Sequence, residues 1–263
     1  MLMEVIIKNV KEDACKLGAK IISCLIHDKE NTVLGLATGA TPLLLYKELV
    51  RFHKQEGLSF KKVSTFNLDE YVGLSPKDPR SFNSYMSENL FKHIDISPEA
   101  INIPDGCAKD VLESCEAYER NIHNAGGIDL QVLGIGNDGH LAFNEPSSSL
   151  SSRTRIKTLT KVTRKANAES FGGEDNVPKH VITMGLGTIM ETRSCLLLAF
   201  GKKKAEAVKA MIEGPITASC PASILQFHQH AIILLDSDAA SLLTRREYYM
   251  EVYAGKPEWQ KWE

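Results

Sequence analysis

The sequence of 263 residues lacks the signatures of several protein classes. Its six cysteines form no C-x-x-C pair and no dense cluster, and most lie in apolar stretches, so we expect reduced thiols. No apolar run approaches the ~20 residues of a membrane helix. In the opening MLMEVIIKNVKED, charged residues follow a short apolar run at once, so we expect no signal peptide. A net charge of −2 gives no reason to expect nucleic acid or a membrane as a partner. These absences favour a cytoplasmic protein.

Common motifs of nucleotide binding and covalent catalysis are also missing. There is no G-x-x-x-x-G-K-[ST] loop, no G-x-G-x-x-G turn, and no G-x-S-x-G elbow or reactive-cysteine signature. The chain shows no internal repeat, low-complexity tract or interdomain linker. We therefore expect a single domain that spans residues 1–263.

The sequence does contain a regular alternation of short apolar runs and amphipathic stretches. IDLQVLGIG, residues 128–136, is an uninterrupted apolar run typical of a strand buried on both faces. The alternation predicts an α/β fold: a Rossmann-like, mostly parallel sheet flanked by helices on both faces. The expected strands are 4–10, 32–39, 62 to a break at Asp69, 128–136, the start of 179–190, 194–201 and 230–236; the expected helices are 11–28, 42–52, 81–91, 111–124, the end of 179–190 and 202–214.

Polar or glycine-rich segments follow four of the expected strands. They are ATGAT, NLDEY, GNDGH and GKKK. Because parallel strands point the same way, these four loops should share one rim of the sheet, where ligands bind in open α/β folds. The rim is therefore the predicted functional site.

Two of the loops suit an anion. LATGATP, residues 36–42, offers Gly39, Thr41 and free amides ahead of a helix, where the helix dipole favours a phosphate. Lys202, Lys203 and Lys204 begin another helix, where positive charge is unfavourable unless an anion lies nearby. The plainer alternatives are an ordinary turn capped by Thr41 and a solvated first helical turn.

The other two loops suit proton transfer. Asp69 and Glu70 directly follow an apolar strand, so one carboxylate should face the rim and act as a general base, unless the pair forms a surface turn. In GIGNDGHLAFNEP, residues 134–146, Asp138 and Glu145 can both approach His140 and give a proton shuttle near neutral pH. A capped turn is the simpler alternative. A metal site is disfavoured because the spacing matches no common ligand motif.

Taken together, these segments resemble the glucosamine-6-phosphate deaminase family, also called the glucosamine-6-phosphate isomerase family. The matching stretches lie in family order between about residues 33 and 235. They are LGLATGATPLLLYKELV, FNLDEYVGL, GIGNDGHLAFNEP, SSRTRIKTLT, ITMGLGTIM and GKKKAEAVK.

The resemblance implies conversion of glucosamine 6-phosphate to fructose 6-phosphate and ammonia, in the catabolism of N-acetylglucosamine, by an ammonia-releasing hydrolase acting on a C–N bond. It implies no metal and no organic cofactor. It makes Asp69 the base at C2 and C1, and His140, supported by Asp138 and Glu145, the group that opens the sugar ring. The implied substrate and phosphate contacts are Thr38, Gly39, Ala40, Thr41, Gly136 and Lys204.

Two further features follow from the resemblance. Residues 155–180 should form a mobile lid, although Glu169 stands where the family carries a phosphate-binding arginine, so Glu169 should turn away and Arg164 or Lys165 could replace it. SSSLSSRTRIKTLT resembles a segment that binds the activator N-acetylglucosamine 6-phosphate between subunits of a homo-oligomer, a hexamer, trimer or dimer. The activator contacts would be Ser148, Arg155, Lys157 and Thr158.

The main alternative function is a 6-phosphogluconolactonase on the same fold. FNEP after DGHLA, which includes Glu145, favours the deaminase, as does Asp69, because lactone hydrolysis needs no base at C2. A non-catalytic sugar-phosphate sensor is a third possibility, disfavoured because all four expected catalytic groups are intact.

Overall fold

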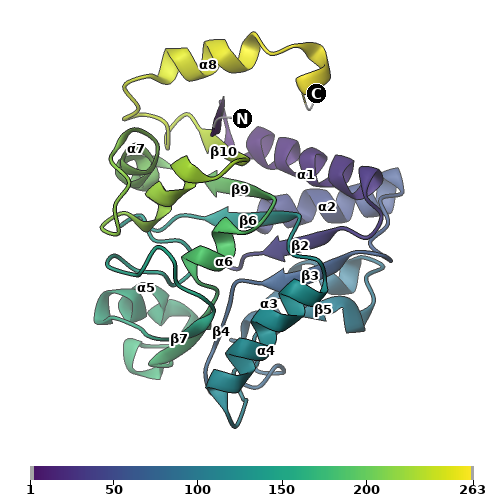
Figure 1. Cartoon of the computed structure of the whole chain (residues 1–263), viewed down its shortest axis with the longest axis vertical. Coiled ribbons are helices and arrows are strands. Elements are labelled where there is room, and N and C mark those ends of the chain that lie inside the picture. Colours follow the sequence, from purple (N-terminus) through teal and green to yellow (C-terminus); the bar gives the residue numbers. More distant parts are fainter. Residues whose placement is uncertain (1–2, 262–263) are drawn as a thin grey trace.

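A seven-stranded sheet forms the centre of the chain, of which the computed structural model describes residues 3–261 (Figure 1). Its strands lie in the spatial order β1-β10-β9-β6-β2-β3-β5, and all neighbours run parallel. The predicted parallel sheet is confirmed, with mostly aliphatic and almost completely buried strands at its centre. The strands are β1 Glu4–Lys8, β2 Val33–Leu36, β3 Ser64–Asn67, β5 Ile101–Asn102, β6 Leu130–Gly134, β9 Ser194–Ala199 and β10 Ala231–Asp236.

Helices cover both faces of this sheet. The chain crosses the sheet one way from β1 through β2 and β3 to β5, and returns through β6 and β9 to β10. Right-handed crossovers therefore place α1 and α2 on one face and α4, α6 and α7 on the other. Within residues 3–261, no helix is long and apolar enough to cross a lipid bilayer. The helices are α1 Lys11–Asp28, α2 Leu43–Glu56, α3 Phe82–Asn89, α4 Val111–Asn124, α5 Lys161–Phe171, α6 Leu186–Met190, α7 Ala205–Glu213 and α8 Arg246–Ala254, with short 3-10 helices η1 Phe91–His93, η2 Pro98–Ala100, η3 Glu174–Asn176, η4 Lys202–Lys204, η5 Pro221–Phe227 and η6 Glu258–Gln260.

The reversal of direction creates a crevice between β2 and β6, which are neighbours in the sheet. Their following loops leave toward opposite faces, and such a switch point is where open α/β sheets bind ligands. The glycine-rich loop after β2 and the histidine loop after β6 therefore flank this crevice.

A second, three-stranded antiparallel sheet was not foreseen from the sequence. It consists of β4 Asp69–Tyr71, β8 His180–Thr183 and β7 Arg155–Thr158, in the order β4-β8-β7. The expected break into a loop at Asp69 is wrong, because Asp69 pairs with Thr183 and begins a new strand. The expected strand near residue 180 exists but belongs to this sheet, since pairing partners are not encoded in local periodicity.

Apolar side chains pack into two groups. The larger group surrounds the parallel sheet, and it includes the thiols of Cys15 and Cys195. All six cysteines lie within the described residues and are free. The smaller group lies between the antiparallel sheet and α5, where Tyr71 packs edge-on against Phe171 at 5.1 Å between ring centroids. This small core fixes α5 beside β4.

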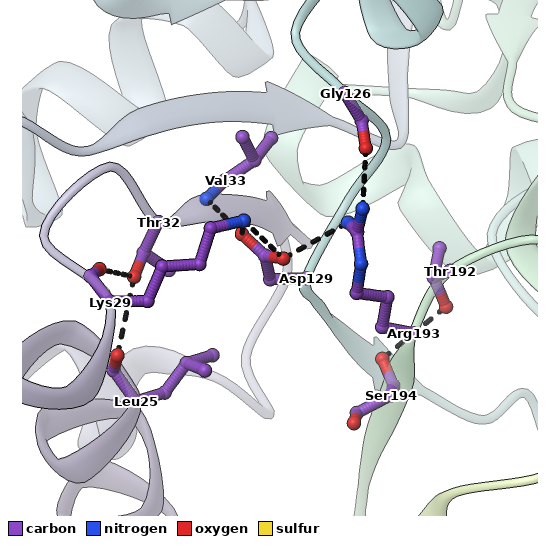
Figure 2. A network of polar contacts seen from close by, with 9 residues as sticks. All are labelled: Leu25, Lys29, Thr32, Val33, Gly126, Asp129, Thr192, Arg193 and Ser194. Atoms are coloured by element: carbon purple, nitrogen blue, oxygen red, sulfur yellow. Dashed lines mark hydrogen bonds and ion pairs between the residues drawn. The ribbon is translucent and has the colours of Figure 1, made fainter.

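At the amino ends of the strands, opposite the crevice, a buried carboxylate holds the central strands together. Asp129, whose side chain is 3% exposed, accepts hydrogen bonds from Lys29 Nζ at 2.7 Å, Val33 N at 2.8 Å and Arg193 NH1 at 3.0 Å. Figure 2 shows Lys29 and Arg193 reaching this carboxylate from opposite sides. The network joins the starts of β2, β6 and β9. It therefore fixes the strands whose far ends carry the functional loops.

Candidate active site

One cavity of about 460 Å³ lies at the carboxyl ends of the strands. The prediction that four separate loops share one rim is confirmed, because each contributes to the lining. The expected site residues found in the lining are Thr38, Gly39 and Thr41 after β2, Asp69 at the start of β4, Gly136, Asp138 and His140 after β6, and Lys204 after β9.

Asp69 is the buried acid of this cavity. Strand alternation turns Asp69 toward the cavity and Glu70 away from it, where Glu70 accepts hydrogen bonds from the main-chain N–H groups of Tyr71, Phe82 and Asn83. Burial, and then the neighbouring Glu70 carboxylate, raise the pKa of Asp69 from 3.8 to about 8, opposed by a hydrogen bond from the Thr38 hydroxyl. A carboxylate with a pKa near neutral pH can accept and return a proton.

His140 lies in a tight loop with Asp138. Asp138 Oδ1 is 2.6 Å from His140 Nδ1. Since a carboxylate only accepts hydrogen bonds, Nδ1 carries the proton and Nε2 is left as a base. Gly136 is required here, because a Cβ atom at this position would lie 2.2 Å from the imidazole ring. The pair can therefore relay a proton at the cavity wall.

The segment 217–223 holds the histidine loop, residues 134–146, in place. Ala222 N donates to Gly139 O at 2.8 Å, and Ser147 N donates to Ala218 O at 2.8 Å. The Ser223 hydroxyl stabilises the supporting turn by accepting from Thr217 N. The loop is thus fixed on both sides of His140 by main-chain hydrogen bonds, which no sequence motif revealed.

The loop after β2 differs in detail from the expectation. β2 ends at Leu36, and the N-cap of α2 is Pro42 without a side-chain hydrogen bond, so the expected cap by Thr41 is wrong. Pro42 itself occupies the cap position, and the Thr41 side chain lines the cavity instead. Ala40 is exposed and lies outside the lining. Three of the four predicted phosphate-loop residues therefore reach the cavity.

Lys204 supplies a positive charge to the same cavity. The turn that carries it is fixed by Asp236 at the end of β10, whose two carboxylate oxygens accept from Gly201 N at 3.0 and 2.9 Å. Burial lowers the pKa of Lys204, while the Asp138 carboxylate opposes this effect. Lys202 and Lys203 are exposed and lie outside the lining. Only the third lysine of the predicted cluster therefore enters the site.

Glu145 is found in a different setting from the one expected. Its buried carboxylate accepts hydrogen bonds from the hydroxyls of Thr160, at 2.9 Å, and Thr163. Thr160 is the N-cap of α5, so Glu145 stabilises the start of this helix. Glu145 was expected to approach His140, but within the described residues it forms no hydrogen bond with this histidine. Among residues 3–261, no three His, Cys, Asp or Glu side chains are arranged to hold a metal ion.

The α5 helix contributes cavity residues that the sequence analysis missed. The side chains come from successive turns of its cavity face, and they are Val162, Thr163, Ala166 and Asn167. The capping pattern of Thr160 and Thr163 could have revealed this helix. Phe82 and Phe143 add an aromatic wall, with ring centroids 6.2 Å apart.

No basic side chain of α5 lines the cavity. Glu169 is exposed and lies outside the lining, as expected for a carboxylate near a phosphate site. Arg164 NH2 lies 3.8 Å from Glu174, and Lys165 is exposed. Neither expected replacement for an arginine therefore reaches the cavity in this arrangement.

The four residues expected to bind an activator lie outside this cavity. Arg155, Lys157 and Thr158 belong to the edge strand β7, where Arg155 and Lys157 share one face. Arg155 NH1 donates to Arg153 O at 3.1 Å, and burial lowers the pKa of Arg155. The Ser148 hydroxyl is buried without a hydrogen-bond partner among the described residues.

Comparisons with known proteins agree with this geometry. A family model described as glucosamine-6-phosphate isomerases/6-phosphogluconolactonase matches residues 7–234. The chain is 49% identical over 260 residues to a glucosamine-6-phosphate deaminase of Corynebacterium kroppenstedtii, covering 99% of this chain and 100% of the relative. It is 51% identical over 247 residues to a protein of the same name from Hahella chejuensis, covering 94% of each.

Solved structures give the same grouping. A structure described as a monomeric glucosamine-6-phosphate deaminase superposes with a TM-score of 0.89 at 45% identity, over 91% of this chain and all of the other. The 6-phosphogluconolactonase of Trypanosoma cruzi shares the fold, with a TM-score of 0.74 at 21% identity over 92% of this chain and 97% of the other. The resemblance inferred from the motifs is confirmed, and the chain belongs to the glucosamine-6-phosphate isomerase/6-phosphogluconolactonase family.

Proposed function

We propose that this chain converts glucosamine 6-phosphate to fructose 6-phosphate and ammonia. The observation that carries the proposal is that Asp69, the His140–Asp138 pair and Lys204 line one cavity. Relatives about half identical over nearly the whole chain bear the deaminase name, whereas the similar lactonase structures are only about one-fifth identical. The deaminase is therefore favoured over the lactonase.

The proposed reaction begins with ring opening. His140 Nε2 takes the proton of the anomeric hydroxyl and delivers a proton to the ring oxygen, while Asp138 holds the imidazole in the required tautomer. The product is the open-chain amino aldehyde. Glu145 would act indirectly, through the start of α5, or by turning toward His140 once the sugar is bound.

Asp69 then moves a proton between adjacent carbons. Its ionised carboxylate removes the C2 proton while a proton of the substrate's ammonium group moves to O1, which gives an enolamine. Asp69 then returns its proton to C1, which leaves a protonated imine at C2. Water hydrolyses this imine to the ketone and releases ammonia, so the net reaction is also the hydrolysis of a C–N bond. The raised pKa of Asp69, about 8, suits a base that must both accept and return a proton near neutral pH.

The phosphate of the sugar is proposed to lie between the loop after β2 and Lys204. The main-chain amides near Gly39 and the hydroxyl of Thr41 supply donors, and Lys204 supplies charge. Thr38 contributes its main-chain N–H, because its hydroxyl donates to Asp69. Because α5 contributes no cation to the cavity, phosphate affinity should depend strongly on Lys204. The neutral α5 face would exclude water above the sugar.

The deciding experiment compares two substrates with one preparation of the protein. Ammonia release is measured with glucosamine 6-phosphate, and acid release is measured with 6-phosphogluconolactone. We expect ammonia from the first substrate and no acceleration with the second. Asp69→Asn should lose ammonia release and hydrogen exchange at C2 while still binding the sugar phosphate. Accelerated lactone hydrolysis without ammonia release would overturn the proposal.

The segment around α5 has a proposed role of its own. We propose that residues 155–180 form a lid on a single domain, supported by the contacts of α5 with the cavity and by its anchoring through Phe171. A cytoplasmic role in N-acetylglucosamine catabolism, without metal or organic cofactor and without nucleic acid or membrane partners, belongs to the same proposal. The six free thiols suit a reducing compartment.

An activator site at Ser148, Arg155, Lys157 and Thr158 is also proposed. Its support is the unpartnered Ser148 hydroxyl and the two basic side chains on one face of β7. The site would require a homo-oligomer if it lies between subunits, whereas one similar structure is described as monomeric. Light scattering with and without N-acetylglucosamine 6-phosphate, together with velocity at low substrate concentration, tests both ideas.

A further inference from the structure

Two tyrosines from different helices hold the loop after β2. Tyr46 of α2 is fully buried, and its hydroxyl donates to Ala37 O at 2.5 Å and accepts from Ala37 N at 3.2 Å. Tyr85 of α3 donates to Gly39 O at 2.6 Å. Burial raises the pKa of Tyr85, which keeps its hydroxyl protonated as a donor. Both ends of the segment 37–39 are therefore held by phenol hydroxyls.

These contacts determine which polar groups of the loop face a ligand. Gly39 has a φ of +99°, a conformation that glycine tolerates and other residues rarely adopt. With its carbonyl oxygen held by Tyr85, the negative end of this peptide is directed away from an anion. Among the described residues, the main-chain N–H groups of residues 38–41 donate no hydrogen bond. The loop thus keeps these N–H groups available to a ligand, while the carbonyl oxygens of Ala37 and Gly39 are occupied by the two tyrosines.

The position of Tyr85 is linked to the strand that carries Asp69. Glu70 accepts from Phe82 N at 3.0 Å and from Asn83 N at 2.9 Å, and it thereby fixes the first turn of α3. Ser81 caps the same turn by accepting from Ser84 N at 3.0 Å. Tyr85 lies one turn further along α3. The helix therefore forms a rigid connection from β4 to the loop after β2.

We propose that Tyr85 is a positioning residue for phosphate recognition, which acts by holding the Gly39 carbonyl away from the bound phosphate. The inference rests on the proposed function, because it assumes that a sugar phosphate occupies this cavity. Tyr85 is absent from the cavity lining, so its effect passes through Gly39 and not through direct contact. The residue should therefore influence binding of the phosphate and leave the chemistry at C1 and C2 unchanged.

Tyr85→Phe tests this role, because it removes one hydroxyl and keeps the ring. We expect the KM for glucosamine 6-phosphate and the inhibition constant of inorganic phosphate to rise together by about five-fold, as for loss of one neutral hydrogen bond. The kcat should stay within about two-fold, because the contact stabilises bound substrate and transition state equally. A matched control is Tyr249→Phe, which removes a tyrosine hydroxyl that lies 3.4 Å from Glu213, near the C-terminus.

The two constants separate positioning from a general loss of structure. Unchanged KM and phosphate inhibition in Tyr85→Phe, or an equal change in the Tyr249→Phe control, would refute the inference. A fall in kcat with unchanged phosphate inhibition would also refute it, since it would assign Tyr85 to the chemistry. If the wild-type protein releases no ammonia, the proposed function fails instead, and direct binding of inorganic phosphate to wild type and Tyr85→Phe still tests the role of Tyr85.

Discussion

The buried carboxylate of Asp69 should make the folded chain less stable as the pH rises. Asp69 is 5% exposed, and its pKa is about 8 in the folded chain against 3.8 for the free side chain. Between these values the folded state holds a proton that the unfolded state has lost. The free energy of unfolding therefore falls with increasing pH across this range, and the loss is complete once the pH exceeds about 8.

Replacement of Asp69 by Asn removes this dependence. Asn keeps the shape and an acceptor for the Thr38 hydroxyl, but it cannot ionise. One pKa unit corresponds to about 1.4 kcal/mol. We therefore expect the stability advantage of Asp69→Asn over wild type to grow by on the order of 4 kcal/mol between about pH 5 and about pH 8.

Urea unfolding at these two pH values measures the effect. Asp238→Asn, which changes an exposed aspartate, is the control and should show no comparable difference. The same pH range should raise kcat/KM of the wild type as the base ionises. A stability difference between the two proteins that is equal at both pH values, or that shrinks as the pH rises, would refute the argument. Such a result would mean that Asp69 is ionised throughout and is an ordinary solvated acid.

Three other outcomes test separate parts of the structure. His140→Gln should slow turnover of the cyclic sugar more than turnover of an open-chain analogue, because only the cyclic sugar needs ring opening. Initial rates measure both reactions, and equal losses would argue against ring opening by His140. Lys204→Gln should raise the KM for the sugar phosphate at least about ten-fold and abolish most inhibition by inorganic phosphate. An unchanged inhibition constant would mean that Lys204 does not bind the phosphate. Asp129→Asn should lower the free energy of unfolding by about 1.5 kcal/mol, measured in urea, because it weakens charge-assisted hydrogen bonds from the half-exposed Lys29 and Arg193. The kcat should be unchanged, because these contacts are remote from the cavity.

Several chemical groups of the site could be identified from the sequence because each follows a strand directly. Asp69, His140 and Lys204 lie in polar segments after apolar runs, and parallel strands bring such segments to one rim. This placement depends only on the order of elements, which hydrophobic periodicity encodes locally. The parallel sheet and its main helices were predictable for the same reason.

Other features arise only when distant segments meet. The burial that raises the pKa of Asp69 depends on β4 pairing with β8, and the partners of Glu145 lie on a helix beyond the next strand. Tyr85 has no motif of its own, and its importance comes from one hydrogen bond across 46 positions of the chain. Local sequence determined the parallel strands, the helices that cover them and the chemical groups after the strands, because these depend on neighbouring residues, whereas β4 became a strand only by pairing with β8. Tertiary packing determined their pKa values, hydrogen-bond partners and rigidity, because these depend on which surfaces exclude water together.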